Sequence, residues 1–203
     1  MNIDAIMRSA PVIPVLVLEE KMDWMALAET FVNAGLPVLE ITMRTPLALD
    51  AIREMGKVSG AIVGAGTVLN DRQLGEAVDA GSQFIVSPGL TGPLGKAVIQ
   101  SGVAFLPGIA NAGDIMRGLD LGLDRFKFFP AEASGGIPAL KALAGPFGNI
   151  RFCPTGGIRP ETARDWLALD PVLCVGGTWF VKPGDDLATI GERARAAAAL
   201  ANA

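Results

Sequence analysis

Residues 123–132 read LDRFKFFPAE, an aromatic, strand-like run with a lysine, Lys127, near its centre. Side chains alternate across a β-strand, so Phe126 and Phe128 point to one face of this strand and Lys127 to the other. If the two phenylalanines pack against covering helices, the lysine points into the interior on the opposite side of the sheet. Burying an ammonium group costs free energy unless the group is paired, so the strand predicts a fold that gives Lys127 a partner or a function.

Eight apolar runs of this kind occur along the chain, each followed by a turn of Gly, Pro, Thr or Ser and then by a segment of helical period. The runs are VIPVLVL (12–18), VLEIT (38–42), AIVGAGT (61–67), QFIVSPG (83–89), AFLPGI (104–109), RFKFFPA (125–131), RFCPTGG (151–157) and VLCVGG (172–177). Residues 22–35, 71–81 and 160–170 are predicted helices, and residues 193–203 predict a terminal helix.

Strands that are apolar on both faces and alternate with helices are typical of a parallel sheet. Eight such units in 203 residues predict an α/β fold, a single-domain (β/α)8 TIM barrel over residues 1–203 with a short N-terminal helix. An open, doubly wound sheet is the alternative fold.

The composition excludes several classes of active site and of binding partner. The chain has no histidine and no tyrosine, which excludes a Ser-His-Asp triad, histidine-ligated metal sites and tyrosine acid–base chemistry. A net charge of −4 without clustered Lys and Arg argues against nucleic acid and leaves small anionic metabolites as partners. No apolar run reaches the roughly 18 residues that span a bilayer, so we expect no membrane partner and a cytoplasmic location. Cys153 and Cys174 are interpreted as buried free thiols.

A barrel places its active site at the carboxyl ends of the strands, where the loops that lead to the helices gather. The polar residues at or just after these ends include Glu40, Arg44, Thr67, Ser87, Asn111, Lys127, Glu132, Thr155 and Thr178. Gly156-Gly157 and Gly176-Gly177 end the last two strands, where barrels commonly hold a phosphate on backbone N–H groups.

The alternation that points Lys127 inward also points Glu40 inward, since its neighbours Leu39 and Ile41 point to the other face of VLEIT. Two opposite charges therefore enter one interior, from the second and sixth strands. One interpretation is a buried structural ion pair. The other is chemical, because desolvation favours the neutral amine, which attacks carbonyl groups. The other lysines lie in helical or turn-like polar segments, so Lys127 is the candidate nucleophile.

Six motifs together make the chain resemble the 2-keto-3-deoxy-6-phosphogluconate (KDPG) aldolase family nearly from end to end: LEITMRT, VGAGTVL, SPG, FKFFPAE, AGPFGNIRFCPTGGI and VLCVGGTW. The resemblance implies a homotrimeric class I aldolase, without metal or other cofactor, that cleaves KDPG to pyruvate and glyceraldehyde 3-phosphate. Several members also cleave 4-hydroxy-2-oxoglutarate (KHG) to pyruvate and glyoxylate.

By position, the resemblance implies that Lys127 forms the Schiff base and that Glu40 is the general acid and base. The implied substrate-binding residues are Arg44 and Thr67 for the carboxylate, Pro88, Phe129 and Thr155 for the pocket wall, and Gly156, Gly157, Gly176, Gly177 and Thr178 for the phosphate. Thr178 stands where members usually have serine, and the following segment WFVKPGDD is shorter than usual, which makes phosphate binding the part of the site that departs from the family pattern.

Three other functions stay open at this point. The substrate could be 2-keto-3-deoxy-6-phosphogalactonate, which differs from KDPG at one carbon. A phosphosugar isomerase or epimerase on a similar barrel would use Glu40 to abstract a proton and Lys127 only as a charge. A catalytically inactive barrel would bind a phosphorylated ligand.

Overall fold

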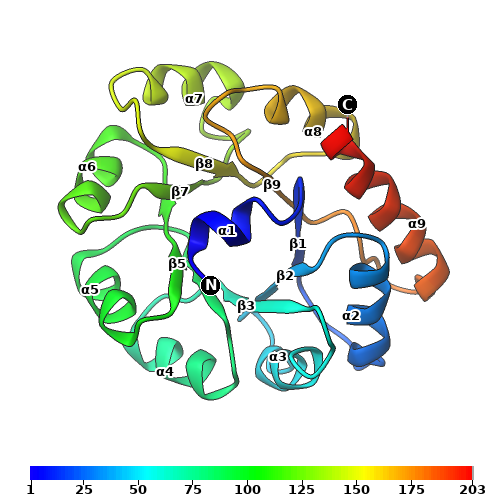
Figure 1. Cartoon of the computed structure of the whole chain (residues 1–203). Coiled ribbons are helices and arrows are strands. Elements are labelled where there is room, and N and C mark those ends of the chain that lie inside the picture. The colour runs from blue at the N-terminus through cyan, green and yellow to red at the C-terminus, as the bar shows by residue number, and fades with distance from the viewer. Residues whose placement is uncertain (203) are drawn as a thin grey trace.

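The structure, a computed structural model, describes residues 1–202; residue 203, the last of the predicted terminal helix and of the predicted domain, lies outside the described residues. Strands occupy the centre of the molecule and helices surround them (Figure 1). The strands are β1 Val12–Leu16, β2 Val38–Thr42, β3 Ile62–Gly66, β4 Phe84–Val86, β5 Ala104–Leu106, β6 Gly108–Ile109, β7 Arg125–Phe128, β8 Arg151–Pro154 and β9 Val175–Gly177. The helices are α1 Ile3–Met7, α2 Trp24–Asn33, α3 Ala48–Met55, α4 Asp71–Asp79, α5 Gly92–Ser101, α6 Ala112–Asp120, α7 Gly136–Ala144, α8 Pro160–Leu167 and α9 Leu187–Ala198, followed by a 3-10 turn at Ala199–Asn202.

Each of the eight apolar runs contains a strand, as predicted, and the run at 104–109 contains two. Pro107 separates β5 from β6 because proline has no N–H to donate to a strand ladder. The predicted segments 22–35, 71–81 and 160–170 contain α2, α4 and α8. The predicted terminal helix begins earlier than residue 193, at Leu187, because Asp186 caps it by accepting a hydrogen bond from the Thr189 amide at 2.8 Å.

All strand pairs are parallel. The strands form a curled six-stranded sheet in the order β5-β4-β3-β2-β1-β9 and a three-stranded sheet in the order β6-β7-β8. From β1 to β5 the order follows the chain without the reversal that marks a doubly wound sheet, so the alternative fold is not the one adopted. Isolated parallel bridges join Phe152 of β8 to Val172 and Thr155 to Gly176 of β9.

Two apolar layers lie on the two faces of the strands. Phe126 and Phe128 of β7 are fully buried in the outer layer. The ring of Phe128 packs on that of Trp166 in α8, with 6.3 Å between the ring centres. The inner layer contains Ile13 and Phe84 together with both cysteines, which are buried and free, as predicted. The hydrogen bond with Cys153 and burial raise the pKa of the Cys174 thiol well above its ordinary value.

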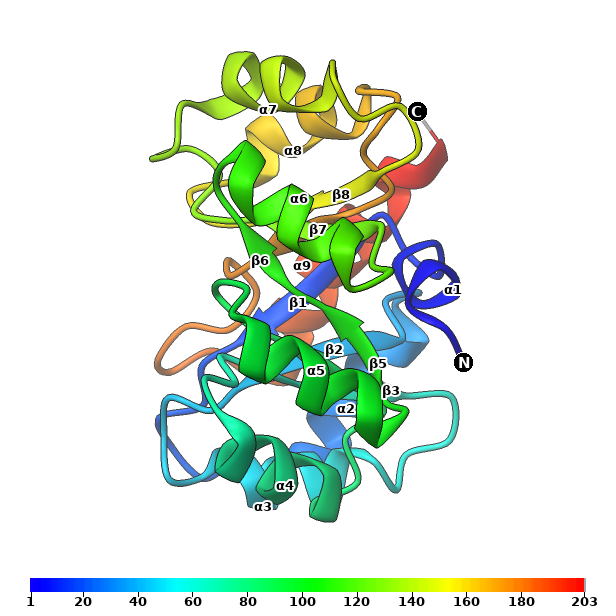
Figure 2. The same ribbon diagram turned by 90° about the vertical axis from the view of Figure 1, so that its left-hand side faces the viewer.

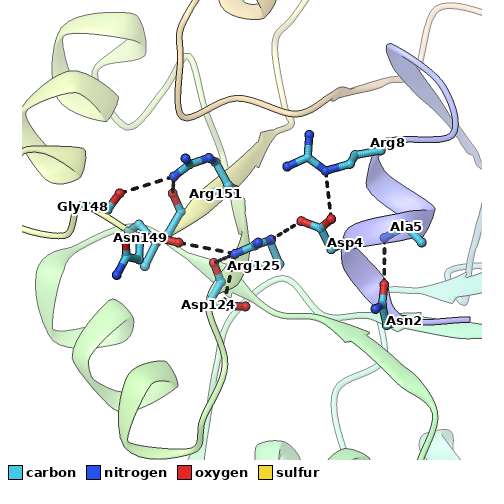
Figure 3. Close-up of polar contacts among 10 residues, drawn as sticks. Asn2, Asp4, Ala5, Arg8, Asp124, Arg125, Gly148, Asn149 and Arg151 are labelled. Atoms are coloured by element: carbon cyan, nitrogen blue, oxygen red, sulfur yellow. Dashed lines mark hydrogen bonds and ion pairs between the residues drawn. The ribbon is translucent and has the colours of Figure 1, made fainter.

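The predicted N-terminal helix is present as α1, which lies across the amino-terminal ends of the strands (Figures 1 and 2). Its Ile6 and Met7 side chains are fully buried and belong to the inner apolar layer. Asp4 of α1 accepts hydrogen bonds from Arg125 at 2.6 Å and from Arg8 at 2.8 Å (Figure 3). The helix therefore covers this end of the strand interior and leaves the carboxyl ends of the strands for a site.

Across residues 1–202, none of the helices combines the length and the apolar character needed to cross a membrane.

Candidate active site

Lys127 and Glu40 meet in the interior of the protein, as their strand positions predict. The Lys127 Nζ atom donates to the Glu40 carboxylate, at 2.9 Å from Oε1 and 3.3 Å from Oε2. The two residues are only 5% and 3% exposed, and they lie 87 positions apart in the chain. The Nζ atom also lies 5.3 Å from the centre of the Phe129 ring. The contact places a buried amine and a carboxylate at hydrogen-bonding distance, which is the geometry of a nucleophile paired with a general base.

Two glycines make room for the polar side chains of the site. A β-carbon on Gly66, at the end of β3, would overlap the Glu40 carboxylate, and one on Gly176, in β9, would overlap the Thr155 hydroxyl. Both positions therefore require glycine if the side chains of Glu40 and Thr155 are to keep their places. Sequence reasoning did not assign Gly66 a role, although the VGAGT motif carries the signal as a glycine inside an apolar strand.

Arg44 and Thr67 lie together at the ends of β2 and β3. The Arg44 Nε atom donates to the Thr67 hydroxyl at 3.4 Å. Thr67 has a φ of +61°, a left-handed backbone conformation that is strained for a β-branched residue. Strain of this kind concentrates at functional sites, so Thr67 stays a candidate site residue.

The three predicted wall residues occupy three different strand ends. Thr155, which follows β8, is 3% exposed, and its hydroxyl is 3.4 Å from the Cys153 carbonyl oxygen, to which it donates. Phe129 follows β7 and lies next to the Lys127 amine. Pro88 follows β4, and its backbone packs so closely on Gly108 that a β-carbon on that glycine would overlap it.

The predicted phosphate-binding glycines lie on the loops after β8 and at the end of β9. Gly156 and Gly157 have φ values of +101° and +82°, which only glycine adopts without strain, and α8 begins three residues later at Pro160. Gly177 packs against the Trp179 ring, and Thr178 beside it is exposed. Helix amino termini and glycine loops are elements that phosphate-binding sites commonly use.

An ion pair connects the short segment after Thr178 to α9. Arg193 of α9 forms an ion pair with Asp185, which also accepts a hydrogen bond from the Lys182 amide at 2.7 Å. The hydrogen bonds from Arg193 hold the pKa of Asp185 below its ordinary value. A surface pocket lies between this segment and residues 17–22, which follow β1.

Three other polar residues at the strand ends make their polar contacts away from Lys127. Asn111 caps α6 by accepting from the Asp114 amide at 3.0 Å, and the Ser87 hydroxyl donates to the Gly89 carbonyl at 2.7 Å. Glu132 accepts a hydrogen bond from the Trp166 indole at 3.1 Å. Within residues 1–202, no three His, Cys, Asp or Glu side chains are grouped so that they could hold a metal ion.

Comparisons with known proteins identify the family of this chain. The family model described as KDPG and KHG aldolase matches residues 3–192. The 2-dehydro-3-deoxy-phosphogluconate aldolase of Zymomonas mobilis is 56% identical over 203 residues, which cover 100% of this chain and 98% of that protein.

Two solved structures are also similar. The KDPG aldolase of Zymomonas mobilis ZM4 with 3-phosphoglycerate has a TM-score of 0.94 and 56% identity, and the match covers 97% of this chain and 95% of that one. The KDPG aldolase of Legionella pneumophila, with pyruvate captured as a covalent carbinolamine, has a TM-score of 0.90 and 41% identity, covering 96% and 97%. The chain therefore belongs to the KDPG and KHG aldolase family and is a lyase.

Proposed function

We propose that this protein is a class I aldolase that cleaves KDPG to pyruvate and glyceraldehyde 3-phosphate, and KHG to pyruvate and glyoxylate. The observation that carries the proposal is the buried contact of 2.9 Å between Lys127 and Glu40 in a chain of this aldolase family. The Legionella relative holds pyruvate as a covalent carbinolamine, which is the adduct that an amine and a keto group form first.

The reaction begins when the neutral Lys127 amine attacks the keto carbon of the substrate. Loss of water from the carbinolamine gives an iminium ion. When the bond between carbons 3 and 4 breaks, its electron pair moves into the iminium and forms an enamine, while carbon 4 leaves as the aldehyde. Protonation of the enamine and hydrolysis release pyruvate and restore the amine.

Glu40 moves the protons in this scheme. Its carboxylate lies within hydrogen-bonding distance of the reacting nitrogen, so it can accept the proton that the nitrogen loses after attack and pass it to the departing hydroxyl of the carbinolamine. It then takes the proton from the hydroxyl on carbon 4, directly or through a water molecule, and returns a proton to the enamine. The chain has no histidine or tyrosine to share this work.

The remaining site residues bind the substrate in this proposal. Arg44 and Thr67 hold the carboxylate of the keto acid, and Pro88, Phe129 and Thr155 line the pocket around carbons 2 to 4. The phosphate is bound by Gly156, Gly157, Gly176, Gly177 and Thr178. A threonine keeps the hydroxyl that serine would supply, so the change at residue 178 preserves a hydrogen-bond donor for the phosphate.

We also propose that the two sheets form one closed eight-stranded barrel and that residues 1–203 form a single domain. Only Pro107 separates β5 from β6, and its carbonyl accepts from the Lys127 amide at 2.8 Å. The bridge between Thr155 and Gly176 supports closure on the other side, between β8 and β9. Counting β5 and β6 as one strand gives the eight strands of the predicted barrel.

From the family resemblance and the composition we infer a cytoplasmic homotrimer, with small keto acids as partners rather than nucleic acid or membrane. Sedimentation equilibrium tests the assembly: a trimer has three times the 21.0 kDa mass of one chain. A monomer or dimer at micromolar concentration would contradict it.

Borohydride trapping tests the chemistry. Sodium borohydride added with pyruvate should reduce the iminium and attach pyruvate to Lys127, with and without EDTA, because the proposed reaction uses no metal. In Lys127→Ala the adduct should be absent and turnover should fall by at least about a thousandfold, as expected for loss of a covalent nucleophile. Intact mass and peptide mapping give the readout.

Two outcomes would overturn the assignment: full trapping in the variant, or loss of activity with EDTA that a divalent metal restores. Absence of any adduct in the wild type would favour an isomerase, an epimerase or an inactive barrel.

A further inference from the structure

We infer that Glu132 is a positioning residue that holds the Gly156-Gly157 loop for the phosphate end of the substrate. The inference rests on the proposed function, because it assigns a specificity role within the same site. Glu132 follows β7, the strand that carries Lys127, and it contacts both the β8 loop and α8.

The first observation is that the backbone of residues 131–132 supports the loop. The Ala131 amide donates to the Thr155 carbonyl at 2.8 Å, and the Glu132 amide donates to the Gly156 carbonyl at 3.0 Å. The segment after the lysine strand therefore fixes the start of the glycine loop through two main-chain hydrogen bonds.

The second observation is that the Glu132 side chain lies directly against Gly157. A β-carbon on Gly157 would lie 2.7 Å from the Glu132 β-carbon and 2.8 Å from its γ-carbon, closer than real atoms pack. The Gly157 backbone, whose φ of +82° already requires glycine, thus rests on the stem of Glu132.

The third observation is that the Glu132 carboxylate is tied to a fixed point. The Trp166 indole donates to Glu132 Oε1 at 3.1 Å, and Trp166 is only 1% exposed, packed on Phe128 of the lysine strand. A buried indole N–H needs an acceptor, and Glu132 supplies it from an otherwise exposed position beside a surface pocket. The ring thus fixes the direction of the carboxylate, and the carboxylate fixes the stem that supports Gly157.

This arrangement predicts an effect that depends on the substrate. KDPG carries a phosphate and KHG does not. A displaced glycine loop should therefore weaken the binding of KDPG and leave the binding of KHG unchanged. Glu132→Ala removes the γ-carbon of the stem and the acceptor, Trp166→Phe removes the donor together with part of a buried ring, and Glu132→Gln keeps an acceptor oxygen and the stem. Trp24→Phe is a matched control, because within residues 1–202 the Trp24 indole N–H is buried without a hydrogen-bond partner.

The experiment measures kcat and KM for both substrates, together with pyruvate trapping by borohydride. In Glu132→Ala and Trp166→Phe we expect the KM for KDPG to rise about tenfold, with kcat, KHG kinetics and trapping close to wild type. Glu132→Gln and Trp24→Phe should match the wild type on both substrates, and the double variant Glu132→Ala/Trp166→Phe should lose no more than Glu132→Ala alone.

Equal losses on KDPG and KHG would reduce the contact to structural support and overturn the inference, and so would an unchanged KM for KDPG or a Glu132→Gln variant as weak as Glu132→Ala. Failure of the proposed function itself appears elsewhere, as absence of cleavage and of pyruvate trapping in the wild-type protein.

Discussion

At the scale of single residues, the site depends on one buried pair of opposite charges. Buried ion pairs contribute little net stability, because desolvation offsets most of their attraction. Lys127 and Glu40, at 5% and 3% exposure, are therefore better explained by chemistry than by folding energy. The ion pair also places the proton carrier of the proposed reaction at 2.9 Å from the nucleophile.

Glu40→Gln separates the two roles of the carboxylate. Glutamine keeps the shape and a hydrogen-bond acceptor but loses the basicity, so retro-aldol cleavage should fall by about a hundredfold or more. Pyruvate trapping should continue, more slowly, because dehydration of the carbinolamine also uses an acid. Rapid-quench trapping and steady-state cleavage assays on the same preparation measure both steps. Near-normal cleavage would leave Glu40 as a structural charge only.

At the scale of elements, a glycine in one strand leaves space for a polar side chain of the neighbouring strand. Gly66→Ala places a methyl group against the Glu40 carboxylate, so it should displace the proton carrier while the strand stays paired. We expect a fall in kcat of about a hundredfold with little change in the far-UV circular dichroism spectrum, since misplacement by about 1 Å has effects of this size.

Gly75→Ala is the matched control for this variant. Gly75 lies within α4, and a β-carbon there meets no other atom within 4 Å. Alanine favours the helix by roughly 0.5–1 kcal/mol over glycine, so this variant should keep full activity and be slightly more stable. Wild-type kinetics in Gly66→Ala would show that the strand shifts to accommodate the methyl group.

The docking of α1 predicts a dependence on pH. Hydrogen bonds from Arg125 and Arg8 hold the pKa of Asp4 below its ordinary value of 3.8. A carboxyl group with a lowered folded-state pKa stabilises the fold above the unfolded-state pKa, and this contribution is lost as the pH falls through the folded-state pKa. The Asp4 side chain is a third exposed, so solvent screening limits the contribution to roughly 0.2–1 kcal/mol.

Asp4→Asn should accordingly lower the melting temperature by about 1–3 °C at pH 7, and the difference from wild type should disappear well below pH 3.8. Differential scanning calorimetry between pH 7 and pH 2.5 gives both values. Asp50→Asn, which breaks an exposed ion pair with Arg53 on α3, is the control and should change little at any pH. A difference for Asp4→Asn that persists at pH 2.5 would assign the effect to packing rather than charge.

At the scale of the whole molecule, the proposed barrel makes the two sheets mutually dependent. If the two sheets join at β5–β6 and at β8–β9, neither sheet can bury its inner face without the other. The chain should then unfold in urea in a single transition. Far-UV circular dichroism and tryptophan fluorescence should give superimposable curves, because Trp24 lies on α2, between two strands of the six-stranded sheet, and Trp166 packs on Phe128 of the three-stranded sheet. Two separate transitions would indicate sheets that fold independently.

The order of strands and helices, and the inward direction of Lys127 and Glu40, could be predicted from the sequence alone. Both depend on local patterns: apolar runs set the strands, and the alternation of side chains sets the direction of each one. The split of the fifth run at Pro107 also has a local cause, which the sequence contained and the prediction did not use.

Only the tertiary structure determined the contacts within the site. Lys127 and Glu40 lie 87 positions apart, and their contact of 2.9 Å exists because the six-stranded and three-stranded sheets bring β2 and β7 to one interior. The same holds for the room that Gly66 leaves for Glu40 and for the hydrogen bond from Trp166 to Glu132, 34 positions apart. Local periodicity sets where a side chain points, whereas the distance between two side chains depends on strand register and sheet curvature, which arise from the packing of the whole chain.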